Sequence, residues 1–153
     1  MSDQGVVLEV RDLKTHFKTP RGVSRAVDGV SFTIRKGEVF AVVGESGCGK
    51  SVTALSIMHI LPQPAGYIAG GSILFHGRDI VTLPEPEKRA IRGSGISMIF
   101  QEPQTSLNPV FTIGFQLAEV FKAHQHLGAA AIREKTLAML KLVGISDPEQ
   151  RLR

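Results

Sequence analysis

The sequence has a single cysteine, Cys48, among its 153 residues. One cysteine excludes an internal disulfide and is typical of a protein from a reducing compartment. Long apolar runs are also missing, because the longest, residues 39–43, has five residues, whereas a membrane-spanning helix needs about 20. The polar start of the chain lacks the basic and apolar regions of a signal peptide. Together these absences predict a cytoplasmic protein.

A strong excess of one charge is missing as well. The chain carries 18 Lys and Arg residues against 14 Asp and Glu residues, a formal net charge of +4. This charge is too small and too diffuse to indicate a nucleic-acid partner. The length suits one domain with a core of its own, and the balance of 42% hydrophobic and 21% charged residues is that of a globular protein rather than a disordered one.

Apolar patterns predict strands followed by helices. Strands are predicted over residues 6–17, 23–34, 39–43, 68–75 and 96–100. Helices are predicted over residues 50–61, 84–92, 113–126 and 129–143. The run 39–43 is apolar without alternation, which predicts a strand that is buried on both faces, as in a parallel sheet covered by helices.

The segment from Gly44 to Ser51 matches the pattern G-x-x-x-x-G-K-[ST] at every fixed position. Glycines let backbone N–H groups approach phosphate oxygens, and the N-terminus of the following helix favours the same anion. Lys50 would reach the β- and γ-phosphates, and the Ser51 hydroxyl would be a ligand of Mg²⁺. The nucleotide-binding residues predicted here are Gly44, Glu45, Ser46, Gly47, Cys48, Gly49, Lys50, Ser51 and Val52.

Chance matches to this pattern are uncommon, at about one in two hundred chains of this length from average residue usage. A strand is predicted directly before the segment and a helix directly after it, which is the context that the motif requires. The simpler alternative is a glycine-rich turn that caps a helix.

Two longer stretches resemble a known family. Residues 36–51, KGEVFAVVGESGCGKS, resemble the start of ATP-binding-cassette (ABC) transporter ATPases. Residues 96–109, ISMIFQEPQTSLNP, resemble the Q-loop segment of the dipeptide and oligopeptide importers in that family. Residues 26–32 and 51–55 point the same way, so the resemblance covers essentially the whole chain.

The resemblance implies an α/β fold. It would comprise a P-loop NTPase (RecA-like) core with an antiparallel β subdomain and the start of a helical subdomain. The β subdomain and phosphate loop would occupy about residues 1–100, and the Q-loop and the start of the helical subdomain about residues 101–153. The family's Leu-Ser-Gly-Gly signature, its catalytic glutamate after an apolar strand and its switch histidine are missing from these residues. We therefore interpret the chain as the N-terminal portion of a longer ATPase, an incomplete ABC ATPase domain without a catalytic residue.

Two further site residues follow from the resemblance. Phe17 occupies the position of an aromatic ring that stacks on adenine; the alternative is an ordinary core residue. Gln101 matches the Q-loop glutamine, which reaches Mg²⁺ and the attacking water; the alternative is a polar residue at the end of a strand. Ser51 and Gln101 are thus the predicted metal ligands.

The implied function is the ATP-binding component of an ABC transporter that imports peptides or related solutes, with ATP and Mg²⁺ as cofactors. Its partners would be a second ABC ATPase domain in a homo- or heterodimer, transmembrane permease subunits and, indirectly, an extracytoplasmic solute-binding protein, with no nucleic acid. It would lie peripherally on the cytoplasmic side of the cell membrane. Three alternatives stay open: a small P-loop kinase or stand-alone NTPase, a non-transport cassette such as a DNA-repair ATPase, and a non-catalytic nucleotide-binding fragment.

Overall fold

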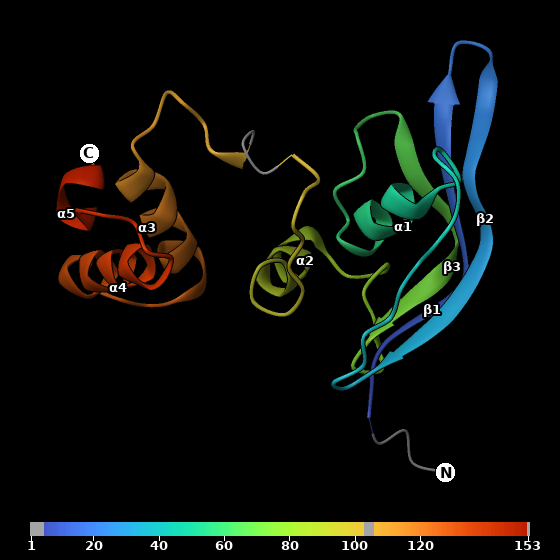
Figure 1. The fold of residues 1–153 in the computed structure, drawn as a ribbon. Helices are drawn as coiled ribbons and strands as arrows, with labels where there is room; N and C mark the ends of the chain where they lie inside the picture. Colours follow the sequence, from blue (N-terminus) through green and yellow to red (C-terminus); the bar gives the residue numbers. More distant parts are fainter. Residues whose placement is uncertain (1–4, 103–105, 153) are drawn as a thin grey trace. The chain divides into compact units, whose positions relative to one another are not determined.

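The structure, a computed structural model, describes residues 5–102 and 106–152 of the chain. Its internal contacts divide the chain into two units, Met1–Arg89 and Ala90–Arg153. The first unit holds the strands and the second holds most of the helices (Figure 1).

An antiparallel sheet forms most of the first unit. Its four strands, in spatial order β2-β1-β3-β4, are β1 (Val6–Thr19), β2 (Gly22–Arg35), β3 (Gly66–Phe75) and β4 (Arg78–Asp79). β1 pairs with both long neighbours. The three strands predicted over residues 6–17, 23–34 and 68–75 are therefore confirmed. The first two were predicted from alternation, which is the pattern of a sheet with one buried face.

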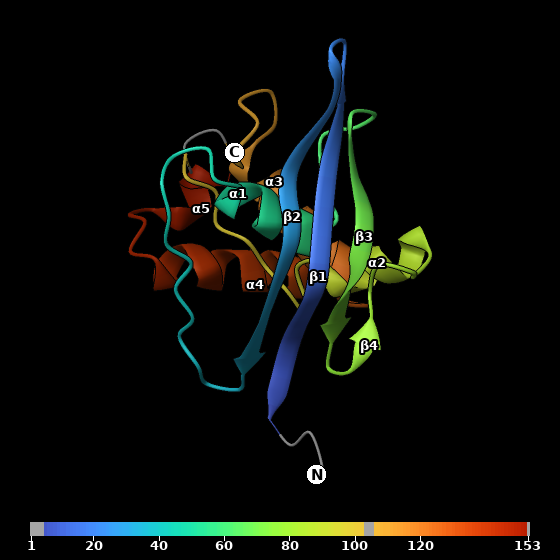
Figure 2. The same ribbon diagram turned by 90° about the vertical axis from the view of Figure 1, so that its right-hand side faces the viewer.

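Helix α1 (Lys50–Ile57) lies against one face of this sheet (Figure 2). The buried apolar side chains of the first unit are Leu8, Val10, Leu13, Val27, Leu61, Ile73 and Ile80. The two fully or nearly buried residues of α1 itself are both hydroxyl residues, Thr53 and Ser56. The helix ends earlier than the predicted residue 61, since His59 adopts a left-handed φ of 53°.

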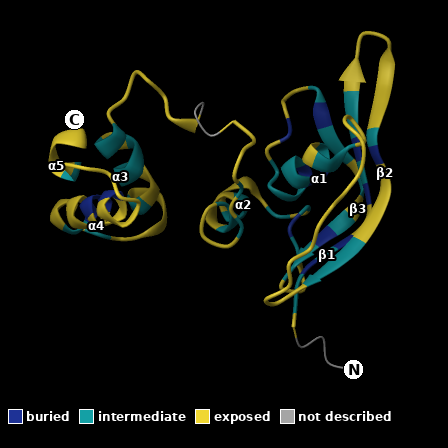
Figure 3. Cartoon of the chain, viewed as in Figure 1, coloured by how far each residue is buried: buried dark blue, intermediate teal, exposed yellow. Residues whose placement is uncertain are grey.

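The prediction of a buried strand over residues 39–43 is wrong. The segment forms no strand and is exposed along its length (Figure 3), with Val39 96% and Val43 88% exposed. A strand is stable only where a neighbouring backbone supplies hydrogen bonds. The described residues offer this segment no such neighbour, and the ring of Phe40 instead stacks on Phe32 of β2, with centroids 5.0 Å apart.

Helices form the second unit. The helices are α2 (Glu85–Ile91), which spans the division between the units, α3 (Ile113–His124), α4 (Ala129–Leu142) and the short α5 (Pro148–Arg151). Thr112 caps α3 by accepting a hydrogen bond from the Phe115 N–H at 3.2 Å. The predicted helices over 84–92, 113–126 and 129–143 are confirmed within a few residues. Among the described helices, none combines the length and the apolar character needed to cross a bilayer.

The strand predicted over residues 96–100 is also wrong. Only an isolated bridge between Arg92 and Ile96 forms there, and Ile99 is 91% exposed. The cause is the same as for residues 39–43, because the apolar run has no paired strand beside it among the described residues.

Candidate functional site

The glycine-rich loop leads directly into α1, as the motif requires. Gly49 is the N-cap of the helix, with φ 93° and ψ 0°, and Gly47 has a φ of 83°. Both lie in the left-handed region that L-residues with a side chain rarely adopt. No side chain caps the first turn of α1, so its N–H groups remain available to an anion.

A bulge in β2 receives this helix end. The β1–β2 register pairs Thr15 with Val27 and His16 with Arg25, and it skips Ala26. A Cβ added to Gly49 would lie 2.5 Å from the carbonyl oxygen of Ala26. Glycine at position 49 thus lets the start of α1 pack directly on the bulge.

The Lys50 side chain folds back over the loop. Its Nζ donates to the carbonyl oxygens of Gly44 at 2.8 Å and Glu45 at 2.6 Å, and it lies 3.5 Å from Cys48 Sγ. An ammonium group has three N–H donors, so all of them are directed into the loop. The contact with sulfur is the weakest, and it is the one that a phosphate oxygen would most easily replace.

A hollow of about 430 Å³ adjoins the loop. The loop contributes Cys48, Gly49 and Lys50 to its lining, and β2 contributes Ala26 of the bulge and residues that follow it. Left-handed glycines, an uncapped helix N-terminus and a lysine ammonium fit a polyphosphate. Of the other predicted loop residues, Glu45, Ser46 and Ser51 are exposed and Val52 is half-buried.

Phe17 lies on β1, paired with Ser24 and Gly66 on the neighbouring strands. The ring is half-buried, and its Cε1 atom lies 2.8 Å from the position that a Cβ on Gly66 would take. The ring therefore packs closely over the Gly66 backbone. The predicted stacking of Phe17 on adenine stays a prediction.

Gln101 belongs to the second unit and is exposed. It lines a hollow with Met98, Phe100, Glu102 and Ser106, and residues 103–105 of the Q-loop-like segment lie outside the described residues. Ser51 belongs to the first unit, so the joint role of Ser51 and Gln101 as Mg²⁺ ligands stays a prediction.

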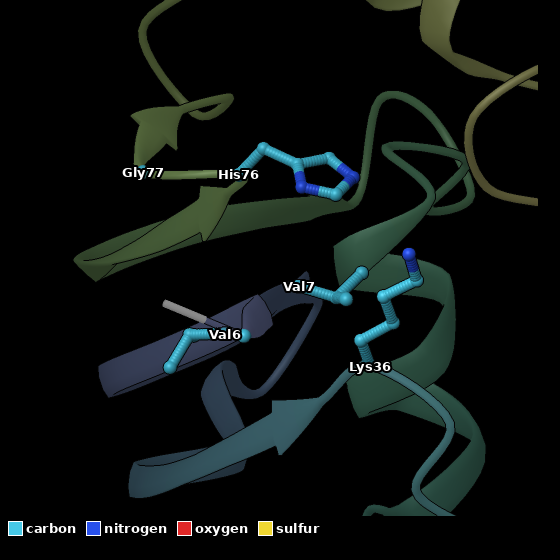
Figure 4. Close-up of a pocket in the computed structure, with 6 residues that line it drawn as sticks. Val6, Val7, Lys36, His76 and Gly77 are labelled. Carbon is cyan, nitrogen blue, oxygen red and sulfur yellow. The ribbon is translucent and has the colours of Figure 1, made fainter. Parts of the chain in front are cut away.

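A second hollow of the first unit, of about 350 Å³, lies where the turns after β2 and β3 approach the start of β1 (Figure 4). Lys36 and His76 supply its polar side chains. Gly5 and Gly77 of its lining also have a positive φ, but no helix N-terminus contributes to it. It serves below as an internal control for binding that depends on positive charge alone.

A buried pair of hydroxyl groups was not singled out from the sequence. Thr15 Oγ1 and Ser56 Oγ lie 2.8 Å apart and both residues are 0% exposed. The available signal was a threonine on the apolar face of a strand, two residues after Leu13, and a serine on the inner face of a helix. Neither pattern shows that the two side chains meet.

The loop, the helix and the lysine together define the class of P-loop nucleotide-binding proteins. The family model described as "ABC transporter" matches residues 27–153. The chain belongs to the ABC transporter family. This finding excludes the alternative of a small P-loop kinase.

Two relatives are about half identical to the chain. The "Probable peptide ABC transporter ATP-binding protein y4tR" of Sinorhizobium fredii is 50% identical over 147 residues, which are 96% of this chain and 44% of that protein. The "Dipeptide transport ATP-binding protein DppD" of Bacillus subtilis is 51% identical over 147 residues, with the same two shares of 96% and 44%. The chain therefore spans less than half the length of these relatives.

A solved structure shares the fold. The dimeric post-hydrolysis state of the ATP-binding cassette MJ0796, bound to ADP and Pi, matches with a TM-score of 0.72 over 92% of this chain and 58% of that one. Its sequence is 18% identical, so this likeness supports the cassette fold alone.

Proposed function

We propose that the chain holds the triphosphate of ATP in the loop 44–51 and belongs to the ATP-binding component of an ABC importer. The observation that carries this proposal is the geometry of Lys50. Its ammonium group closes the loop by hydrogen bonds to two loop carbonyls, directly beside an uncapped helix N-terminus. An anion placed there meets a full positive charge and free N–H groups at once.

Each residue of the site has a role in this proposal. The backbone N–H groups of Gly47, Gly49 and the first turn of α1 bind the phosphate oxygens, and Lys50 supplies the charge. Ser51 and Gln101 hold Mg²⁺, which neutralises phosphate charge when it is bound. Phe17 stacks on the adenine ring.

ATP hydrolysis is the activity of the family, but we propose that these 153 residues alone do not turn ATP over. Phosphoryl transfer needs a group that orients the attacking water and charge on the far side of the γ-phosphate. The sequence contains neither an apolar strand followed by a catalytic glutamate nor a Leu-Ser-Gly-Gly segment. The loop and Lys50 bind the ground state about as well as the transition state, and uniform binding does not raise kcat.

The transport role rests on the relatives. Those at about 50% identity carry the names of peptide and dipeptide transport ATP-binding proteins. We therefore propose coupling to permease subunits that import peptides or related solutes, with a solute-binding protein as an indirect partner. We also propose that a second cassette completes the site; the MJ0796 cassette was solved as a dimer. The protein would lie peripherally on the cytoplasmic side of the membrane.

Nucleotide binding is tested by titrating a fluorescent ATP analogue into the chain and into the variants Lys50→Ala and Lys36→Ala. Lys36 is the matched control, because it lines a separate hollow of the same unit. Lys50→Ala should nearly abolish binding and Lys36→Ala should leave it unchanged. Equal losses in both variants would mean that general positive charge, not the loop, attracts the nucleotide.

The transport role is tested in the cells that carry the gene. Lys50→Ala in the gene should abolish uptake of a labelled dipeptide or oligopeptide, whereas Lys36→Ala should not. Unchanged peptide uptake in the Lys50→Ala strain, with the nucleotide-binding defect established in vitro, would contradict peptide import as the coupled function.

A further inference from the structure

A hydrogen bond between two buried hydroxyl groups joins helix α1 to the sheet. The two buried residues of the helix, Thr53 and Ser56, carry hydroxyl groups. Thr53 is satisfied within the helix, since its Oγ1 donates to the Gly49 carbonyl at 3.0 Å. Ser56 alone makes a side-chain hydrogen bond to the sheet, through its contact with Thr15 of β1, among the bonds that the structure records for the described part of α1.

The direction of this bond follows from the neighbouring one. Ser56 Oγ lies 2.6 Å from the Val52 carbonyl oxygen, which can only accept. The single proton of Ser56 is therefore used on Val52, and Thr15 must be the donor to Ser56. A chain of two hydrogen bonds thus runs from β1 through Ser56 to the first turn of α1. Both hydroxyl residues are fully buried, where a lost partner is costly.

The two ends of α1 are held by different contacts. The N-terminal end rests on the bulge, because Gly49 approaches the Ala26 carbonyl closely. The C-terminal half is held by the Thr15–Ser56 bond, and the chain then continues to Leu61. A Cβ on Gly66 would lie 2.8 Å from Phe17 Cε1 and 3.1 Å from Leu61 Cβ. Leu61, in the segment after α1, and the Phe17 ring thus both border the Gly66 backbone.

We propose that Thr15 and Ser56 are a positioning pair. The pair fixes the C-terminal half of α1, and with it the residues beside the Phe17 ring, relative to the phosphate loop. The pair contacts no nucleotide. It acts by keeping the two ends of the site at a spacing that lets one ATP engage both. This inference rests on the proposed function, because it assigns the triphosphate to the loop and the base to Phe17.

Linked contacts with one ligand strengthen each other only if the geometry lets both form together. Loss of the pair would free the C-terminal half of α1, which leads to Leu61, but leave the N-terminal end at Gly49 on the bulge. ATP should then bind more weakly, whereas inorganic tripolyphosphate, which needs the loop alone, should bind as before. If the pair only stabilised the fold, its loss would change the affinities for ATP and tripolyphosphate alike.

The experiment measures the affinities of ATP and of inorganic tripolyphosphate, each with Mg²⁺, by calorimetric titration of the whole chain. Thr15→Val removes the donor at nearly constant volume, and Ser56→Ala removes the acceptor. We expect each to weaken ATP binding about tenfold, the size that one buried hydrogen bond or one stacked base supports. Tripolyphosphate affinity should change less than about twofold on the same scale.

Two further variants make the result specific. Thr15→Ser keeps the hydroxyl and should restore ATP affinity to the level of the unsubstituted chain. Thr136→Val removes another buried hydroxyl, one that donates to the Ile132 carbonyl at 2.8 Å in the second unit, and it should affect neither ligand.

Three results would overturn the inference. Equally weakened binding of ATP and tripolyphosphate would mean that the pair stabilises the phosphate loop itself and does not set the distance between the loop and Phe17. Unchanged ATP affinity in Thr15→Val and Ser56→Ala would mean that the pair has no positioning role. Failure of the unsubstituted chain to bind tripolyphosphate and ATP would refute the proposed function, and the inference with it; that outcome is recognised before any variant is compared.

Discussion

Replacement of Gly49 by alanine should damage the phosphate loop more than the same replacement at Gly47. Both glycines have a left-handed φ, 93° at Gly49 and 83° at Gly47. That conformation costs an L-residue about 1–2 kcal/mol, and this cost applies to both variants. Only at Gly49 does the new Cβ meet an obstacle, the Ala26 carbonyl oxygen at 2.5 Å, whereas nothing lies within 4 Å of the Gly47 position.

The obstacle at Gly49 is backbone and does not rotate away. Overpacking of this kind costs about 1–3 kcal/mol, because the helix end must move off the bulge. We therefore expect Gly49→Ala to lower the free energy of unfolding by about 2–5 kcal/mol and Gly47→Ala by about 1–2 kcal/mol.

Urea denaturation followed by circular dichroism measures this difference, with a shift of the midpoint at an unchanged slope marking a change in stability. ATP affinity should also fall further in Gly49→Ala than in Gly47→Ala, since the helix N-terminus is displaced. Equal stabilities of the two variants would refute the close contact between Gly49 and the Ala26 carbonyl as the reason for glycine at this position.

Three further predictions concern the loop and the second unit. Cys48 is exposed in the loop, with its sulfur 3.5 Å from Lys50 Nζ, so maleimide should label it readily without nucleotide and slowly with Mg-ATP; a rate that saturating ATP does not change would count against the loop geometry. Phosphate release from ATP by the purified chain should not exceed that of its Lys50→Ala variant; clear Lys50-dependent turnover would refute the proposal that these residues alone do not hydrolyse ATP. Thr112→Ala should remove the cap of α3 and lower the free energy of unfolding by about 1 kcal/mol, as measured by denaturation; no change would show that its 3.2 Å bond to the Phe115 N–H contributes nothing.

Local sequence patterns predicted the helices and the strands that have one buried face. β1 could be anticipated because Leu8 and Val10 alternate with polar residues, and this alternation reflects one buried face. The helices of the second unit could be anticipated from apolar spacing and from flanking polar residues. Neither inference required knowledge of distant parts of the chain.

The apolar runs 39–43 and 96–100 show where this reasoning fails. An apolar run states that a segment is suited to burial, but a strand forms only beside another strand. The structure leaves both runs unpaired among the described residues, with Val39 and Ile99 more than 90% exposed. The sequence of these runs shows that they are apolar, but it does not show whether another strand lies beside them.

The residues of the candidate site could be predicted from the sequence, but the contacts that position them could not. The motif alone assigned the loop residues, because phosphate binding requires glycine and lysine at fixed spacing. The contacts that position the loop were not predictable, since they join residues far apart in the chain. Ala26 meets Gly49 across 23 positions and Thr15 meets Ser56 across 41, and neither contact leaves a periodic signal.

The most direct test of the central claim, that the loop backbone binds the phosphates, is amide NMR of the ¹⁵N-labelled chain during titration with Mg-ATP. We predict the largest shifts at the N–H groups of Gly47, Gly49 and the first turn of α1, with little change at Gly5 and Gly77 beside the hollow of Lys36 and His76. Shifts centred on Gly5 and Gly77, or an unchanged loop at saturating ATP, would contradict the claim.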